Sequence, residues 1–157
     1  MIRVQAADFD PGEELARLTG DRGDIGGVAS FLGLVRDGSG SRPIKAMLLE
    51  HYPGMTERRL AAIEAEAMSR WPLAATVIIH RFGRLRPGER IVLVGAAAAH
   101  RAVAFEACRF LVDFVKTDAP FWKKEETAAG AAWVAASAAD AVQAALWQGK
   151  GKGGDGG

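Results

Sequence analysis

The feature that most constrains this chain is a helix-length apolar stretch with basic residues at both ends. Its apolar positions recur at helical spacing and predict one wide buried face: Ala104, Ala107, Cys108, Leu111 and Val115. His100 and Arg101 precede the stretch, Lys116 ends it, and Pro120 prevents its continuation. A rigid helix that carries cations at both ends indicates a site for an anionic ligand.

The length of this helix limits how the two basic ends can cooperate. A helix from residue 101 to residue 116 is about 22 Å long, at about 1.5 Å per residue. One small ligand cannot touch both ends at once. If both ends serve one site, the second must come from another subunit, and a two-fold dimer would then build two identical composite sites.

Composition excludes several classes of protein. The 157 residues fit one domain, and 49% hydrophobic with 25% charged residues is typical of a globular protein. A formal net charge of +1 gives no global field that would attract nucleic acid or an acidic membrane. The single cysteine, the absence of a signal-peptide layout and the lack of an apolar run of roughly 20 residues predict a soluble cytoplasmic protein.

Periodicity and turn residues predict an α+β fold with a mainly antiparallel sheet and packed helices. We expect strands near residues 2–6, 26–36, 44–52, 75–82, 91–98, 121–125 and 131–134. Helices are expected after an Asp10 cap, from Thr56 to Trp71, from Arg101 to Lys116, and from a Ser137 cap to Trp147. Residues 1–148 form the expected domain, and the Gly/Lys-rich residues 149–157 are predicted to be disordered.

The glycines of the second expected strand do not form a dinucleotide-binding loop. Gly26, Gly27 and Gly33 do not match the G-x-G-x-x-G spacing, and no helix start follows them. They indicate instead a bulge or a close approach of the backbone. Arg36 ends this strand before a Gly/Ser-rich loop.

Lys116 and the pair Lys123 and Lys124 are the strongest candidates for chemistry. A Thr-Asp-Ala-Pro turn joins them, and neighbouring ammonium groups disfavour each other's charge, which favours proton transfer or nucleophilic attack. The alternative is structural: Lys116 stabilises a helix C-terminus and pairs with Asp113, and Lys124 pairs with an adjacent glutamate. Spacing alone favours the structural alternative.

The other polar residues give weaker signals. A cation such as Arg101 at a helix N-terminus is unfavourable, and a bound anion would relieve the conflict; solvated side chains are the alternative. His51, His80 and His100 lack the spacing of a zinc set, and Cys108 on the apolar face is expected to pack. The histidine spacing therefore predicts no metal site. No G-x-S-x-G motif indicates a Ser-His-Asp site, and without a P-loop we expect no ATP chemistry.

Several segments together resemble one known family. They cover residues 31–36, 49–57, 80–85, 99–101 with 104–107, and 116–125, the last reading Lys-Thr-Asp-Ala-Pro-Phe-Trp-Lys-Lys-Glu. In order and spacing, over about residues 2–147, they resemble the large, catalytic subunit family of molybdopterin synthase. The loop after Arg36 and the Ala-rich segment 135–146 depart from the family pattern.

The resemblance implies an α/β-hammerhead type of fold and a sulfur-transfer activity. Enzymes of this family convert cyclic pyranopterin monophosphate to molybdopterin by installing the two dithiolene sulfurs. The donor is a small ubiquitin-like partner with a C-terminal thiocarboxylate, and the assembly is a heterotetramer around a homodimer. No cofactor is implied.

The resemblance also implies roles for single residues. Lys116 and Lys123 match the catalytic lysines of the family. The matching substrate-binding positions are Leu34, Val35, Arg36, His100, Arg101, Lys116, Lys123, Lys124 and Glu125. Two alternatives remain at this point: a non-catalytic anion-binding or scaffold subunit of the same pathway, and a nucleic-acid binder that uses Lys123 and Lys124, which the near-neutral charge disfavours.

Overall fold

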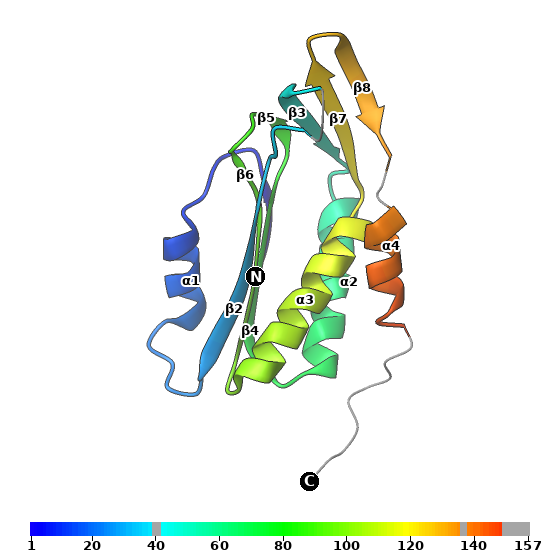
Figure 1. Cartoon of the computed structure of the whole chain (residues 1–157). Helices are drawn as coiled ribbons and strands as arrows, with labels where there is room; N and C mark the ends of the chain where they lie inside the picture. The colour runs from blue at the N-terminus through cyan, green and yellow to red at the C-terminus, as the bar shows by residue number, and fades with distance from the viewer. Residues whose placement is uncertain (39–41, 136–137, 149–157) are drawn as a thin grey trace.

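The computed structural model describes residues 1–38, 42–135 and 138–148 (Figure 1). The strands are β1 (Ile2–Gln5), β2 (Gly27–Leu34), β3 (Ile44–His51), β4 (Leu73–Arg81), β5 (Gly83–Leu85), β6 (Arg90–Ala98), β7 (Phe121–Thr127) and β8 (Gly130–Val134). The helices are α1 (Pro11–Thr19), α2 (Met55–Arg70), α3 (Arg101–Thr117) and α4 (Ala138–Ala145). The predicted helix at residues 101–116 is therefore confirmed.

The strands form two four-stranded sheets. The first sheet has the order β1-β4-β6-β2, and only the β1–β4 pair in it is parallel. The second sheet has the order β5-β3-β7-β8 and is antiparallel throughout. The expected β4–β6 hairpin is present, with His80 opposite Val92. The predicted α+β class with a mainly antiparallel sheet is confirmed.

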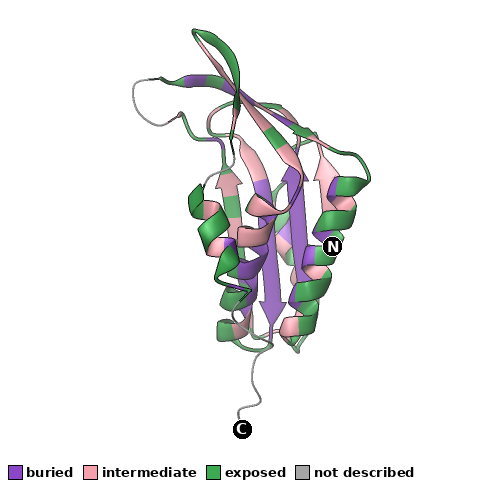
Figure 2. Cartoon of the chain, turned by 90° about the vertical axis from the view of Figure 1, so that its right-hand side faces the viewer, coloured by how far each residue is buried: buried purple, intermediate pink, exposed green. Residues whose placement is uncertain are grey.

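Helices cover both faces of the first sheet. In Figure 1, α1 lies against one face, and α2 and α3 lie against the other. Successive β4 residues alternate between the two sides: Val77 and Ile79 pack with Phe9 beneath α1, whereas Ile78 packs with Leu60 of α2. Because both faces are covered, the central strands are almost fully buried (Figure 2).

A smaller core joins the second sheet to the end of the first. It consists of Val35, Ile44, Met47, Leu49 and Leu85, with Ile91 packed against it. The β7–β8 hairpin extends beyond this core, and its tip is exposed (Figure 2). The second sheet is thus held by few apolar residues, at the edge where β2 and β6 meet it.

The structure confirms the predicted N-cap of α1 and contradicts that of α2. Asp10 caps α1 as expected, since its side chain accepts a hydrogen bond from the Glu13 N–H at 2.9 Å. The expected Thr56 cap of α2 is wrong: Gly54 occupies the N-cap with a φ of 81°, and the buried Thr56 lies in the first turn. Glycine suits this left-handed backbone because it has no Cβ.

Other expectations met the structure only in part. Strand β5 replaces part of the turn expected near Leu85, and Ser137 and residues 149–157 lie outside the described residues. Among the described helices, none combines the length and the apolar character required to cross a membrane.

Candidate functional site

Helix α3 separates the two basic clusters. Its 17 residues span about 24 Å, with Arg101 at one end and Lys116 in the last turn. Strand β2 runs beside it in the same direction: a Cβ on Gly27 would lie 3.8 Å from the Arg101 Cα, while Phe31 faces Lys116. One chain therefore does not bring His100 and Arg101 to the lysines.

Lys116 is exposed and lies against an aromatic ring. Its Nζ is 5.7 Å from the centre of the Phe31 ring, within the range of a cation–π contact. Gly33 leaves room for this ring, since a Cβ there would lie 3.2 Å from Phe31 Cε1 and 2.6 Å from Val92 Cγ1. The register of β2 on β6 also shifts after Gly33, so the predicted close approach and bulge are confirmed at this glycine.

A tight turn leads from Lys116 to β7. The Asp118 N–H closes the helix on the Phe114 carbonyl at 2.8 Å, and the Phe121 N–H donates to the Ala119 carbonyl at 2.9 Å. The second bond spans two residues around Pro120, which is a γ-turn. The chain thus passes from α3 into β7 within a few residues, and β7, which carries Lys123, leads away from the end of the helix (Figure 1).

Lys123 and Glu125 share one face of β7. They lie opposite Leu49 and Met47 of β3, and cross-strand partners project to the same side of a sheet. Leu49 and Met47 pack against Val35 in the smaller core. The structure therefore gathers Lys123, Glu125 and the end of β2 on the inner side of the second sheet.

Lys124 lies on the opposite face of β7. It pairs with Trp133 in the β7–β8 register, and its Nζ is 5.3 Å from the centre of a Trp133 ring. Alternation along a strand makes neighbouring side chains diverge, so the structure does not bring Lys124 to the face that holds Lys123.

The end of β2 presents Leu34 and Arg36 to solvent and buries Val35. The Val35 backbone is already engaged: its N–H donates to the Glu89 carbonyl at 2.9 Å, and its carbonyl accepts from the Gly88 N–H at 2.8 Å. Val35 thus fixes the direction of Arg36 through the turn at residues 86–89, and Arg36 is the group at this strand end that can hold an anion.

The N-terminal end of α3 is exposed and basic. His100 is the N-cap, and among the described residues its side chain makes no capping hydrogen bond; the first turn holds no acidic residue. The exposed Arg101 thus lies in the same helix turn as N–H groups that have no intrahelical acceptor, a combination that is favourable for an anion.

The candidate cations share one electrostatic property. Within the described residues, Lys116, Lys123 and Arg36 have neither an ion pair nor a side-chain hydrogen bond, whereas several other arginines, such as Arg59, Arg84 and Arg90, are paired with carboxylates. The expected partner of Lys116, Asp113, instead accepts a hydrogen bond from Trp147 Nε1 at 2.8 Å. Glu126, a possible partner of Lys124, pairs with Arg84. The purely structural interpretation of these lysines therefore lacks the ion pairs that it predicts.

A buried histidine supports the site from behind, and the sequence did not single it out. His80 stacks on Phe121 with ring centres 3.7 Å apart, and burial lowers the pKa of His80 to about 4. Its Nδ1 is 2.8 Å from the Arg81 carbonyl, which only accepts, so the neutral ring carries its proton on Nδ1. His80 thus acts as an uncharged support for the start of β7.

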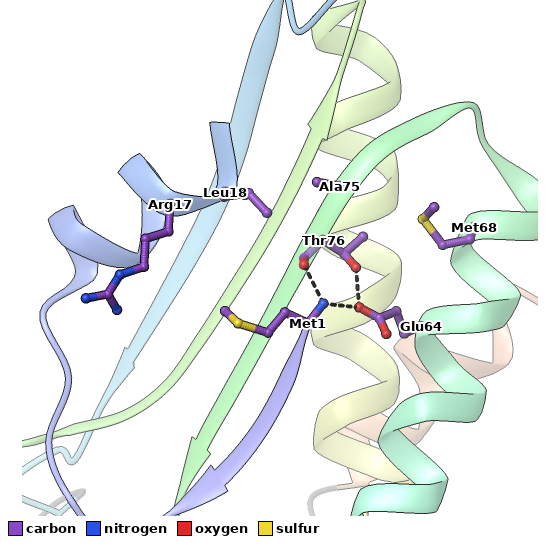
Figure 3. Close-up of a pocket in the computed structure, with 7 residues that line it drawn as sticks. All are labelled: Met1, Arg17, Leu18, Glu64, Met68, Ala75 and Thr76. Atoms are coloured by element: carbon purple, nitrogen blue, oxygen red, sulfur yellow. Dashed lines mark hydrogen bonds and ion pairs between the residues drawn. The ribbon is translucent and has the colours of Figure 1, made fainter. Parts of the chain in front are cut away.

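Cys108 and the two described cavities lie apart from the lysines. Cys108 is buried on α3, and burial raises the pKa of its thiol to about 11, so the expected packing role is confirmed. A cavity of about 410 Å³ lies between α1 and α2, lined by Leu18, Glu64 and Thr76 among others (Figure 3). A second, of about 250 Å³, lies between α2 and α3.

Two sheets joined at an edge, with unpaired lysines on either side of a turn, define an α+β protein with a basic site at the junction of its sheets. Residues 4–118 match the family model described as "MoaE protein". The chain therefore belongs to the MoaE family, and the resemblance seen in the sequence is confirmed.

Curated relatives extend the match beyond the family model. The molybdopterin synthase catalytic subunit of Pseudomonas aeruginosa is 54% identical over 147 residues, which cover 94% of this chain and 98% of that protein. The same subunit of Ralstonia nicotianae is 54% identical over 93% of this chain and 83% of its own length. Like these relatives, the chain is an enzyme subunit of molybdenum cofactor biosynthesis.

Solved structures share the fold. The MoaE protein from Burkholderia ambifaria superposes with a TM-score of 0.82 at 47% identity, covering 96% of this chain and 99% of that chain. Molybdopterin synthase from Staphylococcus aureus has a TM-score of 0.78 at 27% identity, covering 84% of this chain and 95% of that chain.

Proposed function

We propose that this chain transfers sulfur from a thiocarboxylated small partner to cyclic pyranopterin monophosphate and so forms the molybdopterin dithiolene. The observation that carries the proposal is the pair Lys116 and Lys123, which flank one tight turn without an anionic partner among the described residues. A thiocarboxylate and a phosphate ester are the kind of anions that such a site binds. Among solved structures with this fold, one from Helicobacter pylori is a complex of subunits 1 and 2 of molybdopterin-converting factor, which supports a small partner.

The proposed roles follow the positions of the charges. Arg36 at the end of β2 holds the cyclic phosphate, because a guanidinium binds phosphate through two parallel hydrogen bonds. Lys116 contacts the thiocarboxylate tail and the reacting carbon. Lys123 transfers protons as sulfur adds and the phosphate ester opens. Glu125 shares the face of Lys123, so it lines the same site.

Sulfur leaves the partner's C-terminus during each transfer. The carbon–sulfur bond of the thiocarboxylate is replaced by a carbon–oxygen bond from water. On the pterin side chain each new carbon–sulfur bond replaces a carbon–oxygen bond, one of which belongs to the cyclic phosphate ester, so that the phosphate remains attached through its other ester bond. Two such transfers form one dithiolene. The protein supplies charge and proton transfer at each step, and it works in the cytoplasm.

We further propose that the enzyme acts as a homodimer through α3 and β2. Strand β2 lies at the edge of the first sheet, and Phe105 on α3 is 66% exposed. Arg101, Phe105, Val112 and Lys116 follow one helix face, and each pair is symmetric about the helix centre. Antiparallel packing of two copies thus places Phe105 against the partner subunit's Val112, and Lys116 near the partner subunit's Arg101.

The exposed aromatic residues on the outer face of the second sheet support the docking of the small subunit. Trp122 is 45% exposed and Trp133 57%, and Trp122 contacts the exposed Tyr52 ring, with centres 5.8 Å apart. Aromatic side chains with this exposure are typical of protein interfaces. With a small subunit at each outer end of the homodimer, the assembly is a heterotetramer.

Reconstitution tests the proposed activity. The purified protein is mixed with the small subunit in its thiocarboxylate form and with cyclic pyranopterin monophosphate, and molybdopterin is measured. The control uses the small subunit with an ordinary carboxylate C-terminus, which carries no sulfur. Product in the first mixture alone supports the proposal. A Lys116→Ala protein that retains full sulfur transfer would instead favour a non-catalytic scaffold.

A further inference from the structure

A fully buried hydroxyl holds the turn between the two lysines. Thr56 has no exposed surface, and its Oγ1 lies between two backbone groups from distant segments. It accepts a hydrogen bond from the Tyr52 N–H at 3.0 Å and donates one to the Pro120 carbonyl at 3.2 Å. The end of β3, the start of α2 and the turn before β7 therefore meet at one side chain.

The same turn is held a second time from α2. Arg59, one helical turn after Thr56, forms an ion pair with Asp118. The hydroxyl of Thr117 donates to the Asp113 carbonyl at 3.0 Å and ends the helix. The turn thus has contacts to α2 on both sides of Ala119, beyond its own backbone bonds.

The position of this turn decides how far apart the two lysines lie. Lys116 belongs to α3, which packs on the first sheet, whereas Lys123 belongs to β7, which is hydrogen-bonded to β3 of the second sheet. A small shift of one sheet against the other changes the lysine separation unless the linking turn is fixed. Thr56 contacts the turn at Pro120, directly before β7 begins.

We propose that Thr56 is a positioning residue that sets the relative placement of Lys116 and Lys123 through its hydrogen bond to the Pro120 carbonyl. The inference rests on the sulfur-transfer function proposed above. Thr56 is buried and touches neither a reacting atom nor the pterin. Its loss shifts the lysines relative to each other, so it affects the chemical step more than the binding of the pterin. Displacement of a catalytic group by about 1 Å is known to cost up to about 100-fold in rate.

Replacement of Thr56 separates the hydroxyl from the shape of the side chain. Thr56→Val keeps the branched shape and leaves the Tyr52 N–H and the Pro120 carbonyl without their partner. Thr56→Ser keeps the hydroxyl. Arg59→Ala removes the ion pair to Asp118, which is the second contact between α2 and the turn. Because the Arg59 side chain is half-exposed, this variant leaves the buried core intact.

A second buried threonine provides a matched control. Thr76 on β4 is 5% exposed, and its hydroxyl donates to Glu64 beside the N-terminal amine, away from the turn (Figure 3). Thr76→Val therefore removes the same type of hydrogen bond from the same fold. An effect that arises only from general loss of stability will appear in both valine variants.

The test measures kcat and KM for the pterin in the reconstituted system with each variant, and hydrogen exchange of the Asp118 and Phe121 amides. Thr56→Val is expected to lower kcat about tenfold with KM changed less than about twofold. Thr56→Ser is expected to restore kcat to within about twofold, and Arg59→Ala to lower it about threefold. Exchange at Phe121 is expected to accelerate in Thr56→Val and not in Thr76→Val.

Two results overturn the proposal. One is a Thr56→Val protein with unchanged kcat and unchanged exchange at Phe121, and the other is an equal loss of kcat in Thr76→Val. If the wild-type protein shows no sulfur transfer at all, the proposed function fails. The exchange measurement then still decides whether Thr56 holds the turn, because it does not depend on activity.

Discussion

The two ends of α3 carry the same type of charge but are held very differently. At the C-terminal end, Lys116 is followed by a turn that has contacts to α2 and β3, and Lys116 itself faces Phe31. At the N-terminal end, His100 and Arg101 are exposed and the helix has no side-chain cap among the described residues. The C-terminal end is held by contacts within the chain, whereas the N–H groups at the N-terminal end are open to water, an anion or a second protein surface.

This difference indicates which cations act and which only bind. A group that moves protons must be held within a fraction of an ångström, and the buried contacts around residues 117–121 provide that constraint. A group that attracts a phosphate by its charge tolerates more motion, because the Coulomb attraction between two ions falls slowly with distance. The fixed end is therefore suited to chemistry and the open end to binding.

The largest effect on stability is expected from a substitution in the middle of α3, because loss of the helix packing disturbs both of its ends together. Phe110 has no exposed surface, and it contacts Trp71 and Trp147 in edge-on geometry. Phe110→Ala is expected to lower the free energy of unfolding by about 3–5 kcal/mol, as large-to-small core changes do. Urea unfolding measures it. The exposed Val142→Ala control on α4 should change stability by less than about 0.5 kcal/mol.

Removal of a lysine at the fixed end tests the chemistry directly. Lys116→Ala and Lys123→Ala are each expected to lower kcat for sulfur transfer by about 100-fold or more, the range of a lost proton-transfer group. The melting temperature should stay close to wild type, because neither side chain has an ion pair in the described structure. A kcat within about threefold of wild type for both variants would exclude these roles.

Acid is expected to loosen the fixed end through His80. Its pKa of about 4 lies below the unfolded value of 6.5, so the unfolded state binds the extra proton first as the pH falls. The contribution of neutral His80 to stability is fully present above pH 6.5 and is lost as the pH falls toward 4. The free energy of unfolding therefore falls by about 2 kcal/mol between about pH 7 and about pH 5. Urea unfolding at both pH values measures it. In His80→Phe this part of the pH dependence should disappear; an unchanged slope would assign it to another group.

A substitution at the open end is expected to cause the smallest loss of activity as a single variant. The clearest result comes when two variants are mixed. Arg101→Ala is expected to lower kcat/KM about tenfold, with a melting temperature equal to or slightly above wild type, because a cation at a helix N-terminus is unfavourable. Mixed dimers of Arg101→Ala and Lys116→Ala contain one intact composite site. After dissociation and random reassociation, about one quarter of wild-type activity should return.

The mixing experiment needs its own control. Two samples of Lys116→Ala taken through the same dissociation and reassociation should stay inactive. A mixture that is no more active than the average of the two parent variants would contradict the composite site. Arg101 of one subunit would then not complete the site that contains Lys116 of the other.

The parts of this structure that follow local periodicity were predictable from sequence. The apolar spacing of α3, its end before Pro120 and the Asp10 cap depend on neighbouring residues, and each was predicted where it occurs. Gly33 was also recognised as a close approach, although its partner Phe31 was not. The separation of Arg101 from Lys116 followed from helix geometry alone.

The contacts that build the site were not predictable, because they join distant segments. Thr56 was read as a helix cap, and its bond to Pro120 exists only when α2 lies against the turn. His80 has no sequence pattern that reveals burial beneath Phe121. For Lys124 a signal was available: in the strand predicted at residues 121–125, alternation already places Lys123 and Lys124 on opposite faces.

The Thr56–Pro120 bond also has a consequence for the order in which the protein folds. Lys116 and Lys123 are close neighbours along the chain, yet the bond that fixes their turn spans 64 residues. Because closing a loop of that size costs entropy, we expect this bond to form only once α2 lies against α3, so that the reacting geometry forms after the two helices have packed. An incompletely folded chain can therefore have both lysines and an intact α3 and still be unable to turn over substrate.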